Sequence, residues 1–146
     1  MILISACLLG ISCRYNGGCF NLPKLLALVE TGAAVPVCPE TSGGLPIPRN
    51  CIEIRENHRA YESTGIDRTE EIEKGIFQIL NTYPADTISA AVLKDKSPSC
   101  GSCLVYDGSF TGKTIPGKGL FAQELYKLRI PVYHENNYIN LIETAL

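Results

Sequence analysis

The run Thr87-Ile88-Ser89-Ala90-Ala91-Val92-Leu93 is the segment that decides the fold of this chain. It is almost continuously apolar, which is typical of a strand covered on both faces, as in a parallel sheet. The run stops at Lys94 and leads into Ser97-Pro98-Ser99-Cys100-Gly101. We therefore predict a central strand over 87–93, followed by a loop at the carboxyl end of the sheet.

Shorter apolar runs on both sides of this segment predict the rest of the sheet. We expect strands over Ile2–Ala6, Ala33–Val37 and Pro131–His134. Helical patterns separate them: one opened by Pro23, one capped by Asp67 with Glu70 as its reciprocal partner, one over Lys118–Leu128 and one over Tyr138–Leu146. Strands that alternate with helices predict an α/β fold, a single-domain Rossmann-like sandwich over 1–146 with a mainly parallel sheet.

Three connecting segments have their own patterns. Thr41–Arg49 is rich in glycine and proline, so we expect an irregular, ligand-facing loop there. Cys51–Ala60 alternates enough to form an extended arm, with Glu53 and Arg55 on the side opposite the isoleucines. Leu104–Tyr106, with the turn residues that follow it, predicts a short hairpin.

Composition excludes several classes of function. The 146 residues carry a formal net charge of -2 and 19% charged residues, which is unlike the basic surface of proteins that hold nucleic-acid phosphates. We expect no direct nucleic-acid binding, although a neutral, nucleobase-like small molecule fits this charge. The apolar start of the chain lacks the basic region of a secretory signal and is too short to span a bilayer. These features predict a cytoplasmic protein that does not enter a membrane.

Cysteines mark the ends of the predicted strands. The chain has seven of them, an odd number, and in a reducing compartment metal ligation or catalysis is a better explanation than structural disulfides. Cys7, Cys38 and Cys100 each follow a predicted strand. In a parallel sheet these thiols would meet at one edge, where thiolates from separate loops bind zinc or an iron–sulfur cluster.

Spacing alone leaves the ligand set open. Cys13 lies six residues after Cys7 on a glycine-rich loop and is a candidate fourth ligand, which would close the site. Cys100 and Cys103 form a CxxC pair, which also suits zinc or dithiol redox chemistry. Cys19 and Cys51 lie outside these motifs, so we expect them to be core residues. We assign no role to the two histidines, His58 and His134.

Three motifs, in this order, resemble those of the bacterial thiouracil desulfidase family, and the resemblance extends over nearly the whole chain. They are Ile4–Gly10 with Cys13–Gly17, Val35–Glu40 with Gly43–Arg49, and Lys94–Gly101, and the likeness continues through Tyr106–Phe110 and Pro116–Gly119. The resemblance implies a [4Fe-4S] cluster held by only three cysteines, which are Cys7, Cys38 and Cys100 here. Cys13 is then accessory.

The resemblance also implies catalytic groups and a reaction. The matching carboxylate is Glu40, and the hydroxyl falls in Ser97-Pro98-Ser99, where we favour Ser97. The expected reaction is a non-redox, hydrolytic desulfuration of a thiolated nucleobase or related small thiocarbonyl compound, which releases sulfide. Glu40 would act as general base toward water, and Ser97 would hydrogen-bond the ring and relay a proton.

A dithiol redox protein using Cys100 and Cys103 is disfavoured, because a reactive CxxC usually opens a helix whereas Leu104–Tyr106 looks extended. Two other rival functions remain open at this point. One is a non-catalytic zinc or iron–sulfur binding module with a closed site of Cys7, Cys13, Cys38 and Cys100, which predicts no ligand pocket. The other is a cluster-dependent sulfur carrier or a partner in RNA thiolation. The low basic charge counts against direct contact with RNA in that second case.

Overall fold

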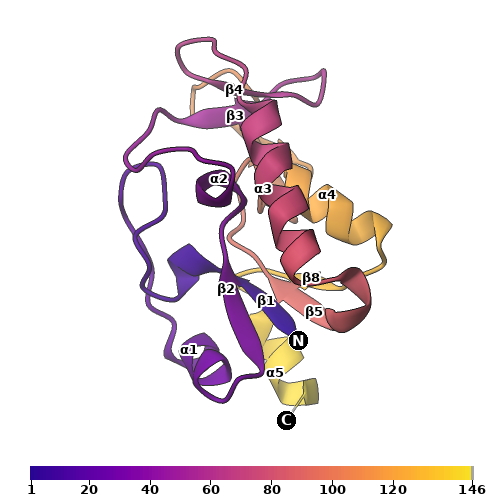
Figure 1. The fold of residues 1–146 in the computed structure, drawn as a ribbon. Coiled ribbons are helices and arrows are strands. Elements are labelled where there is room, and N and C mark those ends of the chain that lie inside the picture. Colours follow the sequence, from indigo (N-terminus) through magenta and orange to yellow (C-terminus); the bar gives the residue numbers. More distant parts are fainter. Residues whose placement is uncertain (146) are drawn as a thin grey trace.

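A parallel sheet forms the centre of the computed structural model, which describes residues 1–145 (Figure 1). Its four strands lie in the order β2-β1-β5-β8 and all run parallel. They are β1 (Ile2–Ser5), β2 (Ala34–Val37), β5 (Ala90–Val92) and β8 (Val132–Tyr133). The predicted α/β fold is confirmed, and the apolar segment 87–93 supplies β5, one of the two inner strands. Thr87 itself belongs to a preceding 3-10 turn.

Helices cover both faces of this sheet. They are α1 (Pro23–Glu30), α3 (Thr69–Thr82), α4 (Leu120–Lys127) and α5 (Tyr138–Ala145), and the expected last helical residue, Leu146, lies outside the described residues. Side chains of α3 and α4 pack with Leu3 and Ala91 in one apolar cluster. Side chains of α1 and α5 pack with Ile4 and Val92 in the other. Adjacent strand residues therefore contribute to opposite layers, as the pleat requires.

The expected start of α3 is wrong in detail. The helix begins at Thr69 rather than directly after Asp67, and the N-cap position is Arg68. The Asp67 carboxylate accepts the Thr69 backbone N–H at 2.9 Å and also pairs with Arg59. Because the helix starts later, Glu70 does not occupy the third helical position that a reciprocal capping box requires.

A short helix, α2 (Pro39–Ser42), lies where we expected an irregular loop to begin. Two glycines let it pack directly on α3. A Cβ atom on Gly75 would lie 1.7 Å from the carbonyl oxygen of Pro39, and one on Gly43 would lie 1.7 Å from that of Glu71. The helix depends on this tertiary contact, which the local composition does not reveal, and the contact fixes the position of Glu40.

Two hairpins lie beyond the sheet. β3 (Ile52–Ile54) pairs with β4 (Ala60–Glu62) in a hairpin. Residues 51–60, which we expected to form one extended arm, therefore form the first strand of this hairpin and the turn that follows it. Glu53, which we placed on the side opposite the isoleucines, is buried like its neighbours. The predicted second hairpin is present as β6 (Leu104–Tyr106) and β7 (Thr114–Pro116). None of the helices in residues 1–145 has the length and hydropathy needed to cross a bilayer.

Candidate active site

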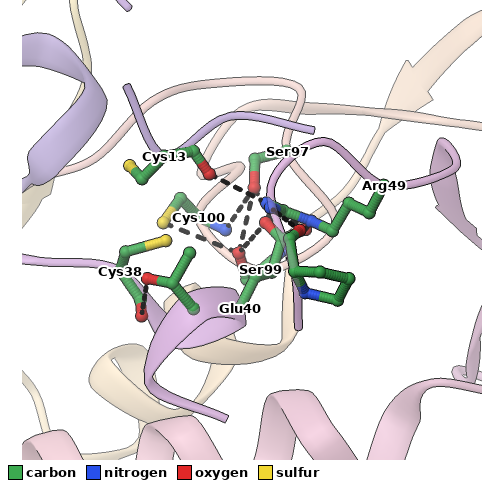
Figure 2. A network of polar contacts seen from close by, with 9 residues as sticks. Cys13, Cys38, Glu40, Arg49, Ser97, Ser99 and Cys100 are labelled. Atoms are coloured by element: carbon green, nitrogen blue, oxygen red, sulfur yellow. Dashed lines mark hydrogen bonds and ion pairs between the residues drawn. The ribbon is translucent and has the colours of Figure 1, made fainter. Parts of the chain in front are cut away.

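Thiol groups from separate strands meet at the carboxyl edge of the sheet. Cys38 directly follows β2, Cys7 lies in a 3-10 turn after β1, and Cys100 lies in the loop after β5. Ser5 pairs with Val37 in the β1–β2 register, so the two strands end at the same level of the sheet. Figure 2 shows the sulfur atoms of Cys38 and Cys100 next to one another, with Cys13 on the same side of the site, and Cys13 contacts the thiols of Cys38 and Cys7. The convergence expected from the strand ends is present.

A cavity of about 490 Å³ opens beside these thiols, a size typical of small-molecule sites. Its lining combines the thiols with carboxylate, hydroxyl, cationic and aromatic groups. They include Cys7, Cys13, Cys38, Cys100, Glu40, Ser97, Ser99, Arg49, Lys94, Tyr15, Tyr106 and Phe110. The geometry therefore joins a soft donor set to groups that can bind and orient a polar organic molecule.

Burial and contact with neighbouring thiols raise the pKa values of three thiols at this site, those of Cys13, Cys38 and Cys100. Burial raises the pKa of Cys100 to about 12, although a hydrogen bond with Ser5 opposes the shift. The hydrogen bond with Cys13, followed by burial, raises the pKa of Cys38. For Cys13, the hydrogen bond with Cys38 lowers the pKa, but the contact with Cys7 and burial raise it to about 11. Thiols in contact with one another can act as ligands of a soft metal once metal binding displaces their protons.

The loop that carries Ser97, Ser99 and Cys100 rests on the N-terminus of α4. The Leu120 backbone N–H donates to the Pro98 carbonyl at 2.9 Å, and the Phe121 N–H donates to the Ser99 carbonyl at 2.9 Å. Gly119 permits this approach, since a Cβ there would lie 2.5 Å from the Ser99 carbonyl. The loop thereby accepts N–H groups at the start of α4 that have no partner within the helix, and these hydrogen bonds fix the path of the loop.

A directed chain of hydrogen bonds connects the two serines to Glu40. The Ser97 hydroxyl accepts the backbone N–H groups of Ser99 and Cys100, at 3.2 and 3.0 Å. Both of its lone pairs are then used, so its own proton donates to Ser99 Oγ at 3.1 Å. Ser99 in turn donates to Glu40 Oε2 at 3.0 Å. Ser99, which is fully buried, thus contacts the carboxylate directly, and Ser97 acts on it through Ser99.

Arg49 holds the other side of the Glu40 carboxylate. Its Nη2 lies 3.1 Å from Glu40 Oε1, and the two side chains are only 5% and 11% exposed. The same guanidinium donates to the carbonyls of Cys13 and Pro46 at 3.1 Å each (Figure 2). Arg49 therefore ties the carboxylate to the loop that carries the fourth thiol. We did not predict this role from the sequence, although Arg49 ends one of the quoted motifs.

The loop over residues 10–21 brings Cys13 to the site. Its ends are joined by a hydrogen bond from the Gly10 N–H to the Phe20 carbonyl at 2.7 Å, and Arg14 lies over the Phe20 ring. Cys13 is buried and in contact with other thiols, so it meets the geometric condition for the fourth ligand that we left open.

The other three cysteines are not part of this thiol cluster, and two expectations about them are wrong. Cys19 is exposed rather than part of the core. Cys51 is half-buried and lines the cavity, where it hydrogen-bonds the Tyr15 hydroxyl and raises the pKa of Tyr15. Cys103 is exposed and lies near Asp95 and His134, away from the other thiols. The CxxC pair is therefore divided between two environments.

Comparisons with known proteins agree with this arrangement. The sequence profile of the 2-thiouracil desulfurase family matches residues 2–137. The chain belongs to the 2-thiouracil desulfurase family. It is 37% identical over 151 residues to the uncharacterised protein YbbK of Bacillus subtilis (strain 168), and the match covers 97% of this chain and 100% of YbbK.

A solved structure is similar over the same length. The [4Fe-4S]-dependent thiouracil desulfidase TudS is 37% identical, with a TM-score of 0.91 over 99% of this chain and 96% of that protein. The family resemblance seen in the sequence motifs is therefore confirmed, and so is the α/β fold predicted from the alternation of strands and helices.

Proposed function

We propose that this protein is a [4Fe-4S]-dependent desulfidase that removes sulfur from a small thiolated nucleobase such as 2-thiouracil. One observation carries the proposal: thiols from three strand ends line the same 490 Å³ cavity as a buried carboxylate and two hydroxyls. Family membership and the likeness to TudS support the same activity. A small thiocarbonyl molecule is the corresponding ligand class.

The donor set fits an iron–sulfur cluster. Cys7, Cys38 and Cys100 are the proposed ligands, because cysteine thiolates are the usual ligands of such clusters and these three leave the carboxyl ends of adjacent strands. With three protein ligands, the bound cluster supplies a Lewis-acidic iron that polarises the carbon–sulfur bond of a thiocarbonyl. Cys13 is the proposed accessory thiol beside them.

Glu40 is the proposed general base. Its Oε2 atom takes a proton from a water molecule whose oxygen adds to the ring carbon, so that an oxo base and sulfide are the products. Arg49 holds Oε1 and Ser99 donates to Oε2, which fixes the plane of the carboxylate.

Ser97 is the second proposed catalytic residue, acting together with Ser99. Both hydroxyls line the cavity. The hydroxyl chain donates from Ser97 through Ser99 toward Glu40, so a proton accepted by the carboxylate is passed toward the substrate when both hydroxyls reverse their donor direction. Ser97, at the outer end of this chain, would hydrogen-bond the ring when its proton turns from Ser99 Oγ into the cavity.

The closed four-cysteine binding module remains the second candidate, because Cys13 contacts Cys7 and Cys38. It is the less favoured of the two. That hypothesis predicts no ligand pocket, whereas the same thiols line a cavity with catalytic groups.

Anaerobic reconstitution with iron and sulfide tests the proposal directly. Iron, acid-labile sulfide, zinc and the visible spectrum are measured for the wild type and for Cys13→Ser, and sulfide release is then measured with 2-thiouracil. We expect near-equal iron and sulfide with broad brown absorption in both proteins, and sulfide release by the wild type. A colourless protein that binds zinc and loses it in Cys13→Ser would contradict the desulfidase and support the closed module.

A further inference from the structure

The loop over residues 107–113, between β6 and β7, forms a wall of the cavity that the chemistry above does not use. Tyr106, Phe110 and Gly112 line the cavity from this side. Phe110 has a φ angle of 58°, in the left-handed region that bulky residues rarely adopt. Such a conformation persists where the surrounding structure enforces it, and it is frequent at ligand-binding sites.

A buried carboxylate enforces this conformation. Glu53 on β3 is 8% exposed, and its Oε1 atom accepts the backbone N–H of Gly108 at 3.0 Å and that of Phe110 at 3.2 Å. Gly108 lies so close to β3 that a Cβ there would be 2.9 Å from the Ile54 carbonyl. Hydrogen bonds at Gly108 and at Phe110 therefore hold the loop against β3, a strand some 55 residues earlier in the chain.

The loop is also closed on itself. The Asp107 backbone N–H donates to the Lys113 carbonyl at 3.0 Å, and the Asp107 carboxylate accepts the Ser109 N–H at 2.9 Å. A segment fixed in this way can present a side chain to a ligand without first becoming ordered, which lowers the entropy cost of binding.

We propose that Phe110 is a specificity-determining residue whose ring stacks on the flat heteroaromatic ring of the substrate, and that Glu53 is the positioning residue that holds it there. The inference rests on the proposed function, since it names how that substrate is held. A neutral ring offers little charge for the cavity to bind. Stacking on an aromatic side chain contributes affinity for any base, because every base has a flat π-face. Tyr15 and Tyr106 add further aromatic surface to the same cavity.

Uracil binding tests the stacking role, because uracil keeps the ring and lacks the sulfur. Calorimetry on the cluster-loaded protein under anaerobic conditions compares the wild type with Phe110→Ala and Phe110→Leu. The control is Phe77→Ala, which removes a phenylalanine that is 70% exposed on α3. We expect both Phe110 variants to bind uracil about tenfold more weakly or worse and the control to match the wild type. Leucine keeps the apolar volume, so wild-type affinity in Phe110→Leu would overturn stacking.

Glu53 has a conservative variant that separates positioning from charge. In Glu53→Gln the amide oxygen still accepts both backbone N–H groups, whereas Glu53→Ala leaves them without this acceptor. We expect Glu53→Ala to raise the dissociation constant for uracil and the KM for 2-thiouracil about as much as Phe110→Ala, with the cluster content unchanged. Glu53→Gln is expected to restore both values. Equal uracil affinity in Glu53→Ala and the wild type would overturn the positioning role.

Failure of this inference and failure of the proposed function give different results. Sulfide release from 2-thiouracil together with wild-type uracil affinity in Phe110→Ala would overturn only the stacking proposal. Cluster-loaded wild type that binds uracil through Phe110 but releases no sulfide would instead contradict the desulfidase while supporting the ring-binding wall.

Discussion

Cys100 and Cys103 lie three residues apart in the loop between β5 and β6, yet their surroundings differ in almost every respect. Cys100 is buried, belongs to the cavity and lies near the Cys38 thiol and Glu40. Cys103 is exposed beside Asp95 and His134. Asp95 Oδ1 already accepts the backbone N–H groups of Ser102, Cys103 and Leu104, at 3.0 to 3.1 Å. The neighbours of a cysteine, and not its spacing from the next one, indicate what it does.

Replacing each cysteine of this pair by serine gives the largest expected contrast. Cys100→Ser removes a proposed cluster ligand, so we expect it to lose cluster binding and sulfide release by more than about 100-fold, beyond the effect typical of outer-shell residues. Cys103→Ser is expected to keep both. Iron and acid-labile sulfide per chain, measured with the rate of sulfide release, check the contrast. Equal losses in the two variants would mean that both thiols serve one site.

The carboxylate on the Cys100 side is expected to affect the rate without affecting the cluster. Glu40→Gln keeps the shape and the contact of one oxygen with Arg49, but an amide nitrogen, which cannot accept a proton from water, then replaces the oxygen that accepts from Ser99. We expect kcat to fall by about 10²- to 10⁴-fold, the usual contribution of a general base, with the cluster content unchanged. Single-turnover sulfide release with matched spectra measures this. An active Glu40→Gln enzyme would require another base.

Alkylation rates should separate the two groups of thiols in cluster-free protein. The raised pKa values of Cys13 and Cys100, about 11 and about 12, leave little thiolate at pH 8. We expect these thiols to react with iodoacetamide at least about tenfold more slowly than the exposed thiols of Cys19 and Cys103. The rate at Cys100 should continue to rise as the pH approaches 11. Peptide mass spectrometry over time checks this, and fast labelling of Cys100 at pH 8 would contradict it.

Asp95, on the Cys103 side, should affect stability rather than rate. Burial opposes its ionisation, but the backbone hydrogen bonds outweigh that effect and lower its pKa below 3.8. The carboxylate therefore stabilises the folded protein above pH 4, and this contribution is lost as the pH falls through the lowered pKa. We expect Asp95→Asn to lower the free energy of unfolding at pH 7 by about 1 to 2 kcal/mol.

Denaturant titration measures this loss at pH 7 and again near pH 3. The difference between Asp95→Asn and the wild type should shrink at the lower pH, because the Asp95 carboxyl of the unfolded wild-type chain then binds a proton more readily than the folded one, whose pKa is lowered. A difference that stays constant, or a fall in sulfide release in the folded variant, would contradict a purely structural role.

The sequence predicted those parts of the molecule that depend on local pattern. Apolar runs followed by Cys7, Cys38 and Cys100 predicted the parallel strands and the edge at which the thiols meet, because strand direction alone determines this. The polar Ser5 inside an apolar strand could have predicted a hydrogen bond between strand ends, and we did not use it. Its hydroxyl accepts the Lys94 backbone N–H at 2.9 Å and so joins the ends of β1 and β5.

Features that depend on contacts between distant segments were not predicted. Arg49 is placed by its contact with Cys13, 36 residues away, and Glu53 by its contact with Phe110, 57 residues away. The helix α2 lies in a glycine- and proline-rich stretch and forms against α3. In each case local propensity is overridden by tertiary packing, which a single sequence does not display.

The glycine contact between α2 and α3 has a consequence for protein engineering. Replacing a helix-interior glycine by alanine is a standard stabilising change, since glycine costs about 1 kcal/mol there. Gly75 looks like a target for this change, yet a methyl group would lie 1.7 Å from the Pro39 carbonyl oxygen. A thermostabilisation campaign guided by helix propensity would therefore displace the segment that carries Glu40, and its selection should score sulfide release as well as melting temperature.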